Sequence, residues 1–180
     1  MQIESPRTSL VEVTVDDVKD IHLLHSFTEV DEFNTLGIPT DIHETETFIQ
    51  NIIEQQNNKP QKSYAWKITL IDTNEFLGLA GLTLSLDKFR RGEIYYKFMP
   101  KHWGKGYATE VAKLLIRTGF DHFYLHRVEA GVATDNIASI KVLEKSGMTR
   151  EGLRRKILPI RGEWKDNYHY AMVEDDPGDY

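Results

Sequence analysis

Residues Pro100–Glu110 combine two glycines and two lysines in a pattern that could hold an anion. A strand-like run, Glu93–Met99, precedes them, and Tyr107–Phe123 follows with apolar residues at helical spacing. A glycine turn between a strand and a helix gathers free backbone N–H groups where the helix dipole is positive. Because Gly104 and Gly106 can adopt positive φ, the sequence predicts that this segment, the glycine loop, binds a pyrophosphate.

Two common phosphate-binding motifs do not fit the glycine loop. A P-loop requires GxxxxGK followed by Ser or Thr, and this string is absent from the sequence. The dinucleotide motif GxGxxG matches Gly104 and Gly106 but meets Thr109 where its third glycine belongs. The alternative that requires no ligand is that the two glycines only close a tight turn between a strand and a helix.

The glycine loop resembles the acetyl-CoA loop of the GNAT superfamily of N-acetyltransferases, in which Gln or Arg precedes xxGxG. Lys101 stands here at that first position. A second segment, Thr134–Met148, resembles the family's N-x-x-S-x-x-x-x-E-K-x-G pattern. Residues Glu151–Asp166 resemble the closing hairpin of the RimJ/RimL branch, which acetylates the N-termini of ribosomal proteins. The resemblance covers roughly Glu75–Val173.

The resemblance implies a single α/β (α+β) domain over residues 1–180, with about seven strands in a mixed, mostly antiparallel sheet and about four helices. An acidic tail is expected at 174–180, and hairpin turns at Asp72–Glu75 and Asp87–Arg91. Alternation and helical spacing predict these strands and helices: strands Thr8–Val13, Ser63–Ile71, Phe76–Leu84, Gly92–Met99, Arg127–Ala133, Thr149–Leu158 and Trp164–Val173; helices at about 17–27, 44–56, 107–123 and 136–146.

The strand before the glycine loop and the strand Arg127–Ala133 are joined through a helix, so they are expected to be parallel neighbours. The resemblance implies that these two strands splay apart and that the pantetheine arm of the cofactor lies in the gap. Backbone N–H groups near Phe98 or Met99 are then expected to stabilise the oxyanion of the reaction.

The reaction that the resemblance implies is direct attack of an amine on the thioester of acetyl-CoA. An α-amine with a pKa near 8 is roughly a tenth neutral at pH 7, whereas a lysine amine is neutral in only about 0.04% of molecules. An N-terminal acceptor therefore requires only modest help from a base. The protein or peptide N-terminus is the leading prediction. The alternatives are a small amine, such as a polyamine, amino sugar or amino acid, and a non-catalytic acyl-CoA-binding domain.

Glu93 is the candidate base, on a strand face shared with Tyr95 and Lys97, because GNAT enzymes often place a catalytic Glu on this strand. A solvated or salt-bridged carboxylate is the alternative. Asn136 and Ser139 lie three residues apart at a helix start. In the family, the Asn bonds the pantetheine arm and the residue matching Ser139 has been cast as the acid. Helix capping is the alternative for Asn136, and simple positioning is the alternative for Ser139.

The other predicted contacts belong to the cofactor and the acceptor. The acceptor pocket is predicted at Asp31, Glu32 and Phe33, in a long loop at Thr28–Ile42, together with Tyr95; a solvated loop is the alternative. The resemblance implies cofactor contacts at Phe98, Met99, Lys101, His102, Trp103, Gly104, Lys105, Gly106, Tyr107, Ala108, Thr109, Asn136 and Ser139, with Lys145 as a further candidate for the phosphates.

Composition narrows the remaining classes of function. A chain of 180 residues with 40% hydrophobic residues suits one domain, and its net charge of −6 argues against general affinity for nucleic acid or an anionic membrane. It has no cysteine, which excludes an acyl-cysteine intermediate. No apolar stretch resembles a membrane span or signal peptide, so a cytoplasmic protein is expected. The seven histidines show no metal-binding motif, so no metal is predicted. The oligomeric state stays open, a homodimer included.

Overall fold

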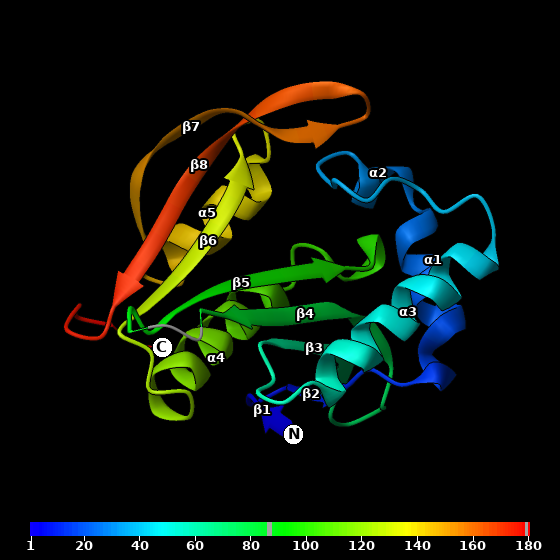
Figure 1. Ribbon diagram of the computed structural model, residues 1–180, viewed down its shortest axis with the longest axis horizontal. Helices are drawn as coiled ribbons and strands as arrows, with labels where there is room; N and C mark the ends of the chain where they lie inside the picture. The colour runs from blue at the N-terminus through cyan, green and yellow to red at the C-terminus, as the bar shows by residue number, and fades with distance from the viewer. Residues whose placement is uncertain (86–87, 179) are drawn as a thin grey trace.

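The computed structural model describes residues 1–85, 88–178 and 180, which form an eight-stranded sheet with helices on both faces (Figure 1). The strand order is β1-β2-β3-β4-β5-β6-β8-β7. In the described residues, β5 and β6 are parallel, and the other neighbouring pairs are antiparallel. The strands are β1 (Gln2–Glu4), β2 (Thr8–Glu12), β3 (Ser63–Leu70), β4 (Phe76–Leu84), β5 (Arg91–Phe98), β6 (Arg127–Ala133), β7 (Thr149–Ile160) and β8 (Glu163–Val173).

The helices divide between the two faces of the sheet (Figure 1). On one face, α1 (Val18–Ser26), α2 (Thr28–Asp31) and α3 (Ile42–Asn57) follow the short 3-10 helix η1 (Val15–Asp17). On the other face lie α4 (Tyr107–Asp121) and α5 (Ile137–Lys145), with the 3-10 helix η2 (Pro100–His102) ahead of α4. Each face therefore has its own hydrophobic core.

Strand alternation explains these two cores. Trp66 and Ile68 of β3 point toward α4, whereas Ala65 of the same strand packs with Ile49 of α3. Between the two layers, β4 is buried on both faces, which is why its sequence is an almost continuous apolar run. The helix α3 begins at Asp41, whose carboxylate accepts hydrogen bonds from the first free N–H groups.

The predicted α/β architecture is confirmed, with two additions. The sheet has eight strands rather than about seven because β1 adds a three-residue edge strand, which is too short to show alternation. The predicted loop Thr28–Ile42 contains the four-residue helix α2, which is too short to show a helical period. Asp87 of the predicted turn Asp87–Arg91 and Asp179 of the predicted tail lie outside the described residues.

The two parallel strands separate after three paired positions. The last pair joins Glu93 of β5 to Glu129 of β6, and both strands continue beyond it without pairing to each other. Figure 1 shows the two strands diverging from that point. The predicted splay is confirmed, and it leaves a gap in the sheet next to the glycine loop.

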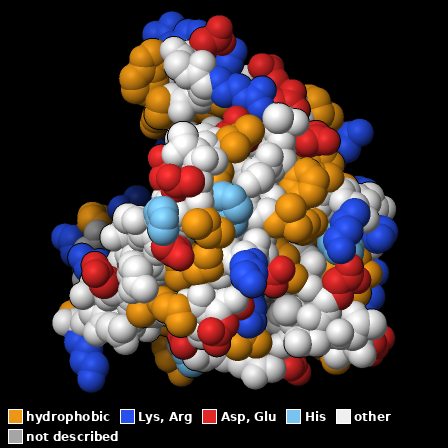
Figure 2. All heavy atoms as spheres, turned by 90° about the vertical axis from the view of Figure 1, so that its right-hand side faces the viewer, with side chains coloured by type: hydrophobic (Ala, Val, Ile, Leu, Met, Phe, Trp, Pro, Cys, Tyr) orange, Lys and Arg blue, Asp and Glu red, His pale blue; other side chains and the backbone are white. Residues whose placement is uncertain are grey.

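The β7–β8 hairpin projects above the body of the molecule. It forms the lobe at the top of Figure 2, where hydrophobic side chains lie beside basic ones. The turn of the hairpin is tied to α2, because Arg161 Nε donates to Asp31 Oδ2 at 2.9 Å and its guanidinium also donates to the Thr28 carbonyl at 2.8 Å. The hairpin thus stands over the side of the gap on which α2 lies.

The chain ends beside the start of β5. Glu174 forms an ion pair with Arg90 at 3.1 Å, and the Tyr180 ring lies 5.4 Å from the Phe120 ring. In the described part of the chain, no helix has the length and apolar character needed to cross a membrane.

Candidate active site

The glycine loop has the backbone that the sequence predicts. Gly104 and Gly106 have φ values of +74° and +83°, in the left-handed region that favours glycine. Gly106 is the N-cap of α4 and offers no side chain to accept hydrogen bonds from the first turn. The free N–H groups of a 15-residue helix therefore meet at this loop and can bind an anion.

A residue far away in the sequence holds this loop in place. Arg7 donates from Nε to Glu110 Oε2 at 2.7 Å and from Nη1 to the Lys105 carbonyl at 3.2 Å, and it lies 4.5 Å from the centre of the Tyr107 ring. In a trans peptide the carbonyl and the N–H point in opposite directions. By holding the Lys105 carbonyl, Arg7 therefore fixes the direction of the Gly106 N–H.

A cavity of about 460 Å³ connects the glycine loop with the gap between β5 and β6. Its walls come from both faces of the sheet, because Tyr96 faces α5 whereas Lys97 faces α2. The cavity brings together most of the predicted site residues: Glu32, Phe33, Phe98, His102, Trp103, Gly104, Gly106, Tyr107, Ala108, Thr109, Asn136 and Ser139. Glu29, Tyr96, Lys97, Ala138, Lys141 and Val142, which the sequence analysis did not predict as site residues, line it too, as does Lys145.

Three predicted cofactor residues lie away from the cavity wall. Met99 is buried against the α1–α3 core. Lys101 Nζ bonds Glu75 Oε1 at 2.6 Å, and Lys105 lies outside the lining of the cavity. Lys141 and Lys145 of α5 are the lysines that line it near the glycine loop.

The backbone also decides which N–H group can face an oxyanion. The Met99 N–H already donates to the Leu77 carbonyl at 2.8 Å, so it does not fit the predicted role. In an antiparallel ladder, neighbouring residues of a strand point their N–H groups to opposite sides. The Phe98 N–H therefore points away from β4 and into the gap, which is the position that the predicted role requires.

On the acceptor side, the structure places two predicted residues elsewhere. Asp31 is buried and holds Arg161 of the hairpin rather than lining the cavity. The Tyr95 ring packs on Gly81 of β4, where an added Cβ would come within 2.1 Å of it. Glu29 and Glu32 lie on the cavity wall beside Phe33, so the α2 end of the cavity is acidic.

Glu93, the candidate base, stands at the point where the gap opens. It is the last residue of β5 that pairs with β6, and its side chain is exposed on the face that carries α1–α3. Glu93 lies outside the cavity lining, and its carboxylate forms no hydrogen bond or ion pair with the described residues. A role for Glu93 in proton transfer therefore requires a water molecule between its carboxylate and the acceptor amine.

Ser139 and Asn136 meet in the wall formed by α5. Asn136 Oδ1 accepts the Ser139 N–H at 3.0 Å, so Asn136 caps the helix while it also lines the cavity. The Ser139 hydroxyl lies 3.0 Å from the Tyr96 hydroxyl. Burial raises the pKa of Tyr96 above its ordinary value, so its phenol stays protonated. Tyr96 points to the strand face opposite Glu93, and this alternation was the signal that could have identified it from the sequence.

If Ser139 is the predicted acid, replacing it with alanine is expected to lower kcat about tenfold and to leave KM for acetyl-CoA within about twofold, because the hydroxyl then acts in the chemical step rather than in binding. Steady-state kinetics with varied acetyl-CoA measures both. Tyr96→Phe keeps the Ser139 hydroxyl and removes only its hydrogen-bond partner, so it should lower kcat less than Ser139→Ala does. A Ser139→Ala enzyme with unchanged kcat would leave the serine a positioning role only. Ser26→Ala, at the exposed end of α1, serves as the matched control.

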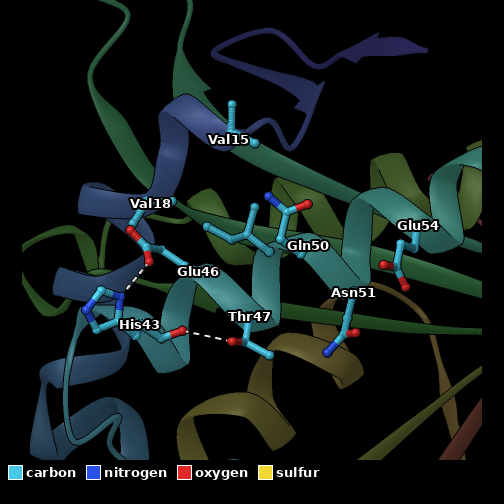
Figure 3. Close-up of a pocket in the computed structure, with 9 residues that line it drawn as sticks. Val15, Val18, His43, Glu46, Thr47, Gln50, Asn51 and Glu54 are labelled. Atoms are coloured by element: carbon cyan, nitrogen blue, oxygen red, sulfur yellow. Dashed lines mark hydrogen bonds and ion pairs between the residues drawn. The ribbon is translucent and has the colours of Figure 1, made fainter.

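Two further hollows contain none of the predicted site residues. One, of about 580 Å³, lies along α3, and Figure 3 shows its polar wall, with the His43–Glu46 contact of 2.8 Å. The other, of about 650 Å³, lies on the β7–β8 hairpin around Trp164. The described residues include no cluster of three or more His, Asp or Glu side chains that could hold a metal ion. Most of the predicted site residues, although not all, therefore lie at the cavity beside the glycine loop.

Comparisons with known proteins point to one family of enzymes. Residues 7–149 match the family model described as the acetyltransferase (GNAT) domain. The uncharacterized N-acetyltransferase YoaA of Bacillus subtilis (strain 168) is 32% identical over 172 residues, which cover 96% of each chain. RimJ of Mycobacterium smegmatis, solved with CoA-disulfide, superposes with a TM-score of 0.84 at 20% identity, over 97% of this chain and 87% of that one. Spermidine N-acetyltransferase of Vibrio cholerae, solved with CoA and spermine, superposes with a TM-score of 0.79 at 20% identity, over 93% of this chain and 95% of that one.

Proposed function

Because the chain belongs to the GNAT family of N-acetyltransferases, we propose that it transfers the acetyl group of acetyl-CoA to the N-terminal α-amine of a protein or peptide. The observation that carries this proposal is the cavity that opens to both faces of the sheet. Its α4–α5 side holds the glycine loop, and its α2 side holds the predicted acceptor residues Glu32 and Phe33. Donor and acceptor can thus approach the gap from opposite faces and react directly.

The residues at the glycine loop fit coenzyme A. Free N–H groups at the start of α4 suit the pyrophosphate, and Lys141 and Lys145 on α5 add positive charge along the same wall. Acetyl-CoA supplies an activated thioester to the gap. The Phe98 N–H is oriented to bond the carbonyl oxygen of that thioester as negative charge develops on it.

The chain's own groups account for the proton transfers. As the amine nitrogen bonds to the acetyl carbon and the carbon–sulfur bond breaks, the amine loses a proton and the sulfur gains one. We propose that Glu93 accepts the proton of the amine through a water molecule. We propose that the Ser139 hydroxyl, which is hydrogen-bonded to the Tyr96 hydroxyl, donates the proton to the sulfur. Both assignments are proposals that the variants described here test.

Two considerations favour an α-amine as the acceptor. An α-amine has a pKa near 8, so a carboxylate acting through water suffices to keep it neutral, whereas an amine near pKa 10.4 requires about 3.4 kcal/mol more. The fold does not choose between acceptors, since RimJ and a spermidine acetyltransferase superpose about equally well. Glu29 and Glu32 at the α2 end favour a cationic acceptor, so a polyamine is the second candidate.

An acceptor screen with thiol detection tests the proposal directly. The chain has no cysteine, so a thiol reagent reports only the released coenzyme A. Peptides with free N-termini should accelerate release more than the same peptides with blocked N-termini and more than spermidine or amino sugars. A preference for spermidine would support the second candidate instead. Acetyl-CoA binding with no release for any amine would point to a non-catalytic binding domain. The cytoplasmic location stays a prediction.

Glu93→Gln is expected to lower kcat about fivefold to tenfold near pH 7 and to leave acetyl-CoA affinity unchanged. The loss should shrink as the pH approaches the acceptor's pKa, because the free amine then forms without a base. A pH profile of kcat with one peptide acceptor measures this. An identical profile in variant and wild type would remove the assignment. Glu54→Gln, on the outer side of α3, is the control for the same change of charge.

A further inference from the structure

Lys97 is a charged residue near the end of the aromatic strand β5, and it lines the cavity on the α2 side. Its ammonium donates to Asn34 Oδ1 at 2.9 Å. An ammonium has three N–H donors, and in the described residues this is the one hydrogen bond that the Lys97 ammonium forms. Two donors of a partly buried cation in the cavity wall are therefore without a protein acceptor.

The surroundings hold Lys97 in place without neutralising it. The carboxylate of Asp31 raises the pKa of Lys97, but its ion pair is with Arg161. His25 of α1 is buried beside Lys97 and is neutral near pH 7. Burial outweighs the effect of Asp31 and lowers the pKa of Lys97 to about 8, so the ammonium is still mainly protonated at pH 7.

An ammonium that is desolvated on a cavity wall binds best to a ligand that brings an oxygen atom. Leaving such a donor unpaired costs free energy, and a carbonyl or carboxylate oxygen relieves that cost. A second cation placed there would be repelled. The Lys97 side of the cavity thus favours an amine whose neighbouring carbon carries a carbonyl group over an amine that carries a second cation.

We propose that Lys97 selects the acceptor by donating a hydrogen bond to the carbonyl oxygen adjacent to the acceptor's α-amine. The substrate class is then an α-amino carbonyl compound, such as a peptide N-terminus, rather than a polyamine. Glu29 and Glu32, at the same end of the cavity, would contact groups further along the acceptor. This inference rests on the proposed function and narrows it to the chemistry at the first residue of the acceptor.

The test compares two acceptors with the same amine-bearing carbon, alaninamide and isopropylamine, in which a methyl group replaces the carboxamide. Rates are compared at equal concentrations of neutral amine. Wild type should prefer alaninamide. Lys97→Met should lower kcat/KM for alaninamide about tenfold and change that for isopropylamine by less than about twofold, since a hydrogen bond from a charged donor is lost only with the first. Lys97→Arg keeps a cation and should retain part of the preference.

The pH dependence gives a second readout. The bond requires a protonated Lys97, so kcat/KM for neutral alaninamide should fall as the pH rises through about 8 in the wild type. The other charged or titratable groups on this side are Glu29 and Glu32 on the cavity wall, Asp31 with its partner Arg161, and His25. The fall should disappear in Lys97→Met, in which all of these groups remain.

The controls separate this inference from the function on which it rests. Lys62→Met makes the same change at an exposed site next to β3 and should leave both acceptors unaffected. Equal losses on the two acceptors, or no loss on either, would overturn the role of Lys97. A wild-type enzyme that acetylates isopropylamine or spermidine but no α-amino carbonyl compound would instead overturn the proposed acceptor class. Thermal melting of each variant checks that it is folded.

Discussion

Replacing Gly106 with valine is expected to weaken acetyl-CoA binding at least a hundredfold. A β-branched residue at a φ of +83° carries roughly 1–2 kcal/mol of strain and relaxes by rotating the backbone. The same rotation turns the Gly106 N–H away from the phosphates, and hydrogen bonds to charged groups contribute about 1.5–3 kcal/mol each. Isothermal titration calorimetry with acetyl-CoA measures the loss. Space is not the cause, because the nearest atom to an added Cβ is Arg7 Nη2 at 3.5 Å.

Gly37→Val is the matched control for this prediction. Gly37 has a φ of +80°, an added Cβ there meets no atom within 4 Å, and the residue lies outside the cavity lining. It therefore has the same backbone strain without a place in the glycine loop. Both variants should lose a similar amount of stability, but only Gly106→Val should lose affinity for acetyl-CoA. Equal acetyl-CoA affinity in the two variants would contradict a phosphate-binding role for the loop.

His25 is expected to make the protein sensitive to acid. It is buried at the end of α1, its ring meets Phe48 edge-on at 5.2 Å, and its Nε2 has no partner among the described residues. Burial, with smaller contributions from Lys97 and His22, lowers its pKa to about 3. The unfolded chain binds this proton near pH 6.5 and the folded chain does not, so its effect on stability is absent above pH 6.5 and grows as the pH falls toward 3.

At pH 4.5, His25 alone should cost about 2.5 kcal/mol of the free energy of unfolding, a large share of the total for a domain of this size. Urea denaturation at pH 7 and 4.5 measures it. His25→Leu should remove that part of the pH dependence. His122→Leu, at the exposed end of α4, should leave the dependence as it is. An equal loss of stability between pH 7 and 4.5 in wild type and His25→Leu would show that the ring is protonated in the folded state.

Local patterns predicted most of the fold because most helices and strands are long enough for their hydrophobic pattern to repeat. The strands β3, β4 and β5 and the helices α3 and α4 each span several periods of their pattern. Among the strands and α-helices, the two that were missed are β1 and α2, which are three and four residues long. Pairing with β2 holds β1, and Arg161 of the hairpin bonds α2. The strand splay came from the resemblance to a family, since no local pattern specifies where two strands stop pairing.

The site was predicted best where one segment forms it. The glycine loop lies within eleven consecutive residues, and its conformation matched the prediction. Long-range contacts decided the rest. Lys101 was expected at the phosphates but bonds Glu75, and Asp31 was expected at the acceptor but bonds Arg161. A sequence shows that such side chains are charged, but the partner that each one finds depends on the folded chain.

Arg7 connects the start of the sheet to the glycine loop. Its hydrogen bonds to Glu110 and Lys105 join the segment between β1 and β2 to a helix about a hundred residues later in the chain. If coenzyme A binds at the glycine loop, its binding and the docking of that segment are linked equilibria, so each makes the other more favourable. The amide protons of β2 should become slower to exchange with solvent when the nucleotide is present, although no atom of β2 lines the cavity.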